Sequence, residues 1–313
     1  MLTPAEFHNT VNVVFHDVEA SHYDAIHAGM WESLGEQINL LVNDLENSGQ
    51  LPLRDLRLLD IGCGTGLSTE LLLKTPLGRQ ITDITLLDTS PNMLMHAEEK
   101  AKKWGKKYSL SNSDVNALRG TYDVIIVSSV LHHIPDLEQF LTKISGLQNQ
   151  DGIFIHMQDP NGDYMADETY AKRAEEYDGI QKKGISLKKQ LFSLVPKSIK
   201  REANKLLGRK NYIDFVNEKL IEKKAIKHAM TPEEIWSVTD IHVENLPFSI
   251  GSGISMKFIK EVLDGYSLTS MRSYGFYGLL KSELEPEYQK KEQALIAVKE
   301  LNGRHVSGVW IKK

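Results

Sequence analysis

The sequence predicts an α/β fold in which a mostly parallel sheet is covered by helices on both faces. Short apolar runs alternate with amphipathic helical segments through the first half of the chain, which is the pattern of such folds. The run at 122–129, YDVIIVSS, is apolar almost throughout, as expected for a strand buried on both faces. Three alternating glycines follow the apolar run that begins at Arg57, where a strand would turn into a helix over a ligand.

About seven strands are expected, and the last of them should be antiparallel to its neighbours. Apolar runs place the strands from Arg57 into the glycines and at 84–88, 108–110, 122–129, 152–158, 266–276 and 306–313. Helices are expected at 28–48, from Ser90 to about Trp104, at 136–147 and at 286–301. The first of these is predicted by Trp31, Leu34 and Ile38, which follow one another at steps of three and four residues.

The length of 313 residues suits one catalytic domain with a sizeable insertion. We expect an N-terminal helical cap over 1–50 and a ligand-binding core over 51–160. Residues 161–250 carry helical signals and no convincing strand, which indicates an inserted helical lid. Residues 251–313 would complete the core sheet.

Composition narrows the class of protein. The formal net charge of −5 argues against a general nucleic-acid binder, because such proteins are usually basic. Cys63 is the only cysteine, so an internal disulfide is excluded and a cytoplasmic location is expected. We find neither a secretory signal nor a run of about 18 apolar residues, so no membrane partner is expected. A monomer and a homodimer both remain open.

The segment 60–66 reads DIGCGTG and forms the central motif. Its G-x-G-x-G spacing favours a nucleoside ligand without a pyrophosphate, because dinucleotide sites use G-x-G-x-x-G. A tight turn without a ligand is the alternative, although a bare turn seldom needs three glycines. Asp88 ends the second strand, where a carboxylate can accept both hydroxyls of a ribose. It could instead cap the next helix, a role that Thr89 or Ser90 can also fill.

Four segments carry a resemblance to a known family. They are LLDIGCGTG, LLDTSPNML, SDVNAL and YDVIIVSSVLHHIPD. With them the chain resembles the class I S-adenosylmethionine-dependent methyltransferases, in a branch of small-molecule enzymes similar to quinone-biosynthesis methyltransferases. The resemblance implies a Rossmann-like sheet, S-adenosylmethionine as the cofactor, and methyl transfer to O, N or C of a small molecule.

The resemblance also implies a set of cofactor-binding residues. The set is Tyr23, Asp60, Gly62, Gly64, Gly66, Asp88, Thr89, Met93, Asp114, Val115, Asn116, Ser128 and His133. Within it, Asp60 would lie near the ammonium group of the methionine part and Asp88 would take the ribose hydroxyls. Asp114 would take the adenine amino group, and Tyr23 would close over the methionine part.

A catalytic base is needed only if the accepting atom carries a proton. The candidates are His133, His132 and Asp159, at or near the carboxyl ends of strands, and histidine suits the role because its pKa lies near neutrality. Each has a simpler alternative: His133 as a positioning group, His132 as a packing group and Asp159 as part of a turn. His156 lies in mid-strand and is more typical of a core histidine. No ligand spacing indicates a metal site.

The segment 172–227 is unusually basic, with sixteen Lys or Arg against seven Asp or Glu. A solvated helical face explains this most simply. A lid that recognises an anionic substrate is the sharper alternative, and RNA recognition is a distant third, because interleaved aromatic residues are lacking. Two other functions stay open, namely an enzyme that cyclises or eliminates S-adenosylmethionine and a non-catalytic regulator that binds it.

Overall fold

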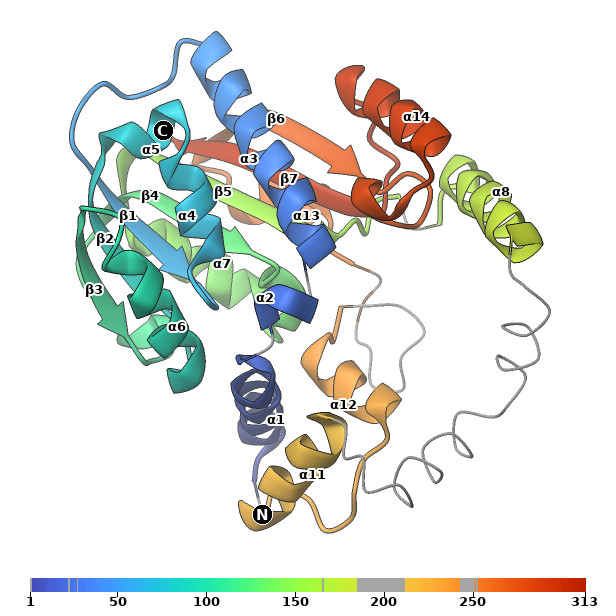
Figure 1. The fold of residues 1–313 in the computed structure, drawn as a ribbon. Coiled ribbons are helices and arrows are strands. Elements are labelled where there is room, and N and C mark those ends of the chain that lie inside the picture. Colours follow the sequence, from blue (N-terminus) through green and yellow to red (C-terminus); the bar gives the residue numbers. More distant parts are fainter. Residues whose placement is uncertain are drawn as a thin grey trace.

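A seven-stranded sheet forms the centre of the protein (Figure 1). The structure is a computed structural model, and it describes residues 2–21, 23–26, 28–164, 166–184, 212–242, 251 and 253–313. The strands are β1 (Leu56–Ile61), β2 (Ile81–Leu87), β3 (Lys107–Ser111), β4 (Tyr122–Ser128), β5 (Gln148–Pro160), β6 (Tyr266–Tyr274) and β7 (His305–Lys312). Their order in the sheet is β3-β2-β1-β4-β5-β7-β6. The first five strands are parallel, and β7 is antiparallel to both β5 and β6. The predicted α/β class, seven strands and antiparallel last strand are confirmed.

Helices pack on both faces of the sheet. They are α1 (Pro4–Glu19), α2 (Tyr23–Ile26), α3 (Ala28–Asn47), α4 (Leu67–Leu73), α5 (Pro76–Gln80), α6 (Pro91–Ala101), α7 (Leu137–Gly146), α8 (Glu168–Gly184), α11 (Tyr212–Glu222), α12 (Pro232–Thr239), α13 (Met256–Val262) and α14 (Pro286–Ala297). Short 3₁₀ turns lie at η1 (Val115–Ala117), η2 (Leu131–His133) and η3 (Lys281–Glu283). The helix predicted at 286–301 ends at Ala297, because Lys299 adopts a left-handed φ of 57°.

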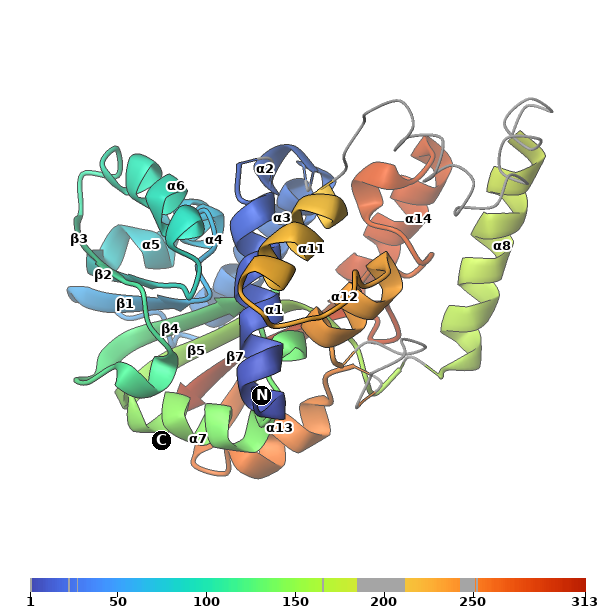
Figure 2. The ribbon, with the colours of Figure 1, turned by 90° about the horizontal axis from the view of Figure 1, so that it is seen from below.

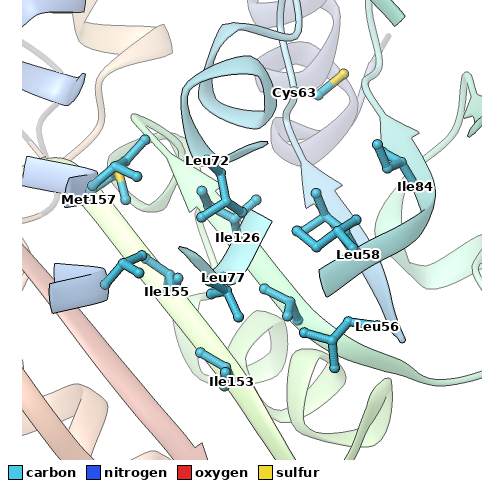
Figure 3. Packing of buried hydrophobic residues seen from close by; sticks show 14 of the residues in the cluster. Leu56, Leu58, Cys63, Leu72, Leu77, Ile84, Ile126, Ile153, Ile155 and Met157 are labelled. Atoms are coloured by element: carbon cyan, nitrogen blue, oxygen red, sulfur yellow. The ribbon is translucent and has the colours of Figure 1, made fainter. Parts of the chain in front are cut away.

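Successive side chains of the parallel strands enter two different hydrophobic clusters. Leu58 packs under the helices of one face, whereas its neighbour Leu59 packs on the other face. Figure 3 shows the first cluster, which contains Leu58, Ile126 and Leu72 of α4. This two-sided burial explains the nearly continuous apolar runs of the sequence. The carboxyl ends of the strands are thereby fixed side by side at one edge of the sheet.

The described part of the expected insertion lies in two separate places (Figures 1 and 2). Helix α8 lies beside α14, where the Tyr177 ring packs 4.9 Å from the ring of Tyr288. Helices α11 and α12 instead pack against α1, and Lys219 of α11 forms an ion pair with Asp17 at 3.3 Å. Much of the basic segment, at 185–211, lies outside the described residues, so the predicted single lid stays a prediction there.

Candidate active site

The carboxyl ends of β1, β2 and β4 open into a cavity of about 400 Å³, and α1 forms its opposite wall. Ligands of open α/β sheets bind at this edge. Eleven of the thirteen expected cofactor residues line the cavity: Tyr23, Gly62, Gly64, Asp88, Thr89, Met93, Asp114, Val115, Asn116, Ser128 and His133. The structure thus brings most of the predicted set together, while the role of each residue stays a prediction.

The three glycines of the loop serve different needs, although all have left-handed φ values between 52° and 81°. A Cβ on Gly62 would lie 2.6 Å from Cγ2 of Val130, so close packing of the loop requires this glycine. Gly66 is limited in the same way by Ala97 at 3.3 Å and does not line the cavity. A Cβ on Gly64 would meet no atom within 4 Å. Because Gly64 lines the cavity, its missing side chain leaves room for a ligand.

Asp88 is held at the cavity by two main-chain amides. Its Oδ2 accepts a hydrogen bond from N of Gly64 at 2.8 Å, and its Oδ1 accepts one from N of Ser90 at 2.8 Å. Ser90, not Asp88, caps α6, since its Oγ accepts from N of Met93. Burial raises the pKa of Asp88, while these amides and nearby His16 oppose the rise. Each carboxylate oxygen keeps a second lone pair, which suits the expected hydroxyl partners.

Asp60 does not reach the cavity. Its side chain is buried, and Oδ2 accepts hydrogen bonds from the hydroxyls of Ser68 at 2.8 Å and Thr69 at 2.6 Å. Its Oδ1 has no hydrogen-bond partner among the described residues. The place that the resemblance implies for Asp60, beside the ammonium group of the cofactor, stays a prediction. In this geometry Asp60 ties β1 to the first turn of α4.

The Asp60 carboxyl should make the stability of the protein depend on pH. Burial raises its pKa to about 6, although the hydrogen bonds from Thr69 and Ser68 oppose the rise. An unfolded aspartate has a pKa of about 3.9, so this group stabilises the fold below about pH 4 and loses that contribution as the pH rises through about 6. Asp60→Asn should therefore gain about 2–3 kcal/mol in free energy of unfolding relative to the wild type between about pH 4 and pH 7.

Urea denaturation across this pH range measures the difference. Asp55→Asn is the control, because Asp55 is exposed and should show no such drift. Parallel stability curves for the wild type and Asp60→Asn would contradict the prediction.

The turn after β4 carries the histidine candidates. Nδ1 of His132 lies 2.8 Å from Oδ1 of Asp159, which also accepts from the His132 amide at 3.2 Å. Nδ1 of His133 lies 2.8 Å from the carbonyl oxygen of Thr239 and 3.2 Å from Oδ1 of Asp240. His133 lines the cavity, whereas His132 and Asp159 do not. The structure therefore favours His133 among the three predicted catalytic residues.

The surroundings of the two histidines shift their pKa values in opposite directions. Burial would lower the pKa of His133, but the hydrogen bond and charge of Asp240 outweigh it and raise the pKa above its usual value. Burial also lowers the pKa of His132, with a further contribution from the charge of His133. Burial alone would raise the pKa of Asp240, yet its contact with His133 lowers it to about 2. Asp240 therefore carries its negative charge at neutral pH.

His132, His133 and Asp240 each place one possible ligand atom within 4.8 Å of the others. The distances of 3.2 and 3.7 Å between Asp240 and the two rings are those of hydrogen-bonded or ion-paired groups. Nδ1 of His133 also faces a carbonyl oxygen at 2.8 Å and must carry hydrogen to bond with it. We therefore describe these residues as a network of hydrogen bonds and ion pairs, and the expected lack of a metal site stays a prediction.

One face of α1 supplies cavity residues that were not predicted from the sequence. His8, Asn9, Asn12 and His16 all line the cavity. Nε2 of His8 and Oδ1 of Asn12 are buried without a hydrogen-bond partner among the described residues. Burial also lowers the pKa of His8 to about 4, so its ring is neutral at neutral pH. The four-residue spacing of His8, Asn12 and His16 was the available signal.

Residues 59–154 match a family model described as a methyltransferase domain. The segment 59–154 of this chain therefore has the sequence of a methyltransferase domain. The chain is 27% identical over 165 residues to a ubiquinone biosynthesis O-methyltransferase from Azorhizobium caulinodans, and this match covers 47% of the chain and 63% of the relative. It is 32% identical over 107 residues to an enzyme of the same name from Methylocella silvestris, covering 33% of the chain and 40% of the relative.

The chain thus spans less than two thirds of the length of these relatives. Among solved structures, it is similar to magnesium protoporphyrin IX methyltransferase from Synechocystis PCC 6803 with bound SAH, at 15% identity and a TM-score of 0.45. That match covers 92% of the chain and 85% of the other protein. Within the described ranges, every helix is too short or too polar to cross a membrane.

Proposed function

We propose that the protein transfers the methyl group of S-adenosylmethionine to a hydroxyl group of a small molecule. One observation carries the proposal: the glycine loop, Asp88 and His133 line the same cavity. The loop and Asp88 are suited to hold a nucleoside, and His133 is suited to take a proton beside it. The names of the two relatives, both O-methyltransferases, support oxygen as the accepting atom.

In this proposal the cofactor supplies an electrophilic methyl group, and the chain aligns the acceptor with it. His133 accepts the hydroxyl proton at Nε2 while the acceptor oxygen forms its bond to the methyl carbon. Bound S-adenosylmethionine would supply the methyl group as an electrophile and would leave as S-adenosylhomocysteine, with the electron pair of the carbon–sulfur bond kept on sulfur. The polar face of α1 would orient the acceptor through the unpartnered atoms of His8 and Asn12.

Other features of the protein are proposed on narrower grounds. The single, buried Cys63 supports a cytoplasmic location, since the chain makes no internal disulfide. The expected preference for an anionic acceptor came from the basic segment, much of which lies outside the described residues, so we propose no charge for the acceptor. A small-molecule acceptor, without nucleic acid, suits a cavity of about 400 Å³.

Product analysis tests the proposed reaction. The purified protein is incubated with S-adenosylmethionine and, in turn, with phenols, alcohols and primary amines as acceptor probes. We expect S-adenosylhomocysteine and a methyl ether in equal amounts with at least one hydroxyl probe. Methylthioadenosine as the product would favour cyclisation or elimination. Absence of S-adenosylmethionine binding in calorimetry would refute the proposal, and tight binding without turnover would favour a regulator.

A further inference from the structure

The end of helix α12 is docked on the turn that carries His133. The carbonyl oxygen of Thr239 and Oδ1 of Asp240 lie 2.8 and 3.2 Å from Nδ1 of the His133 ring. Two residues further on, Nε2 of His242 donates to the carbonyl oxygen of Ile134 at 2.9 Å. These contacts join residues more than a hundred positions apart in the chain. The His133 ring is therefore held by residues that lie outside the methyltransferase-domain segment 59–154.

This docking determines which nitrogen of His133 can act as a base. A carbonyl oxygen can only accept a hydrogen bond, so Nδ1 carries the hydrogen that bonds to Thr239. The lone pair of the neutral ring is then on Nε2, because Nδ1 is the nitrogen that contacts Thr239 and Asp240. His133 lines the cavity. A proton taken from an acceptor at Nε2 would make the ring cationic, with the Asp240 carboxylate on its other side.

We propose that Asp240 is a positioning residue for methyl transfer, which holds His133 in its basic tautomer and stabilises the imidazolium that forms when the acceptor loses its proton. The inference rests on the function proposed above. Asp240 does not line the cavity, so it acts through His133 and not on the acceptor. Its side chain is 33% exposed, which leaves it hydrated enough to stay charged beside the ring.

Other titratable groups face His133 from the elements packed around it. They are Asp240 after α12, Asp159 of β5, His132 in the same turn, and His8 and His16 of α1. The three histidines disfavour a second positive charge when protonated, and only the two acids favour it. Asp159 is hydrogen-bonded to His132. Asp240 is therefore the acid placed to stabilise a cationic His133 directly.

The position of Asp240 depends on how α12 is held. Ile235 of α12 packs with Val14 of α1 in one apolar cluster, and a capping box between Thr231 and Glu234 fixes the start of the helix. The helix has only eight residues, so its two ends are positioned together. Asp240 therefore lies beside His133 only when α12 is packed on α1.

Histidine titration followed by NMR tests the inference independently of turnover. In Asp240→Asn the titration midpoint of His133 should fall by about one pH unit, as expected when an opposite charge within about 4–6 Å is removed. The kcat should fall about tenfold and the acidic limb of its pH profile should move to lower pH, while the KM for S-adenosylmethionine changes less than about twofold. Asp240→Glu should restore much of the midpoint and of kcat.

Glu234→Gln is the matched control, because it removes one negative charge from the other end of α12 while glutamine can keep the hydrogen bond of the capping box. It should leave the His133 midpoint unchanged. An unchanged midpoint in Asp240→Asn, or an equal shift in Glu234→Gln, would overturn the inference. If Asp240→Asn does not give the circular dichroism spectrum of the wild type, Asp240→Glu decides instead. This variant keeps the negative charge, so the titration midpoint of His133 must stay within about half a pH unit of the wild-type value. Failure of methyl transfer in the wild type would refute the proposed function, while the titration would still decide the link between Asp240 and His133.

Discussion

Gly64→Val should fold but bind S-adenosylmethionine at least about 100-fold more weakly than the wild type. The valine side chain would stand in the cavity, because a Cβ at this position meets no protein atom within 4 Å and Gly64 lines the cavity. Its φ of 52° adds strain, which for a β-branched residue costs about 1–3 kcal/mol. A loss of 100-fold corresponds to about 2.7 kcal/mol of binding free energy. Isothermal titration calorimetry measures it directly.

Gly120→Val separates the two effects of this substitution. Gly120 also has a left-handed φ, of 88°, and a Cβ there also meets no atom within 4 Å, but the residue is exposed and does not line the cavity. The strain should therefore be similar while the affinity stays unchanged. Equal affinities for Gly64→Val and the wild type would show that the ligand does not approach this part of the loop.

His133→Ala should reduce kcat by about 10²- to 10⁴-fold, the range expected for loss of a general base. The base must be neutral to accept a proton, so activity in the wild type should fall as the pH drops through the pKa of His133. Asp240 holds that pKa above its usual value, which places this acidic limb closer to neutrality. The limb should disappear in the variant. Steady-state rates measured from about pH 5 to pH 9 follow both effects.

His96→Ala controls for the loss of a histidine elsewhere on the protein. His96 lies on α6, is 30% exposed and faces Glu99 at 4.0 Å, away from the residues that line the cavity. Its rate and pH profile should match those of the wild type. A small loss of rate in His133→Ala with the acidic limb intact would leave His133 a positioning role only.

The sequence predicts the sheet well because local signals define it. Strand burial on both faces appears directly as apolar runs, and even the weak run at 108–110 forms β3. The motif residues around Gly64 and Asp88 also meet at one cavity, because parallel strands end at the same edge of a sheet. The Asp60 side chain could not be placed from the sequence. Its Oδ2 accepts hydrogen bonds from Ser68 and Thr69, and the residue does not line the cavity, so its role toward the cofactor stays a prediction.

The roles of α1 and α12 at the cavity could not be predicted from the sequence, because packing between distant segments determines them. Nothing near Asp240 in the chain marks it as a partner of His133; the contact exists only because α12 packs on α1. The cavity face of α1 was likewise hidden. Its histidines and asparagines look like ordinary surface residues until Val11, Val14 and Phe15 are seen to pack with α11 and α12. The orientation of the helix then follows.

The side of helix α1 that packs in the apolar cluster is different from the side that lines the cavity. Its apolar side is covered by α11 and α12, whereas His8, Asn9, Asn12 and His16 face the cavity and take no part in that apolar cluster. A change among these four residues would alter the shape and hydrogen bonding of the cavity while leaving the packing of the cap in place. If the proposed function holds, a few substitutions in this one helix should change which acceptor the protein takes. A library restricted to these four positions is the natural starting point for redesigning its specificity.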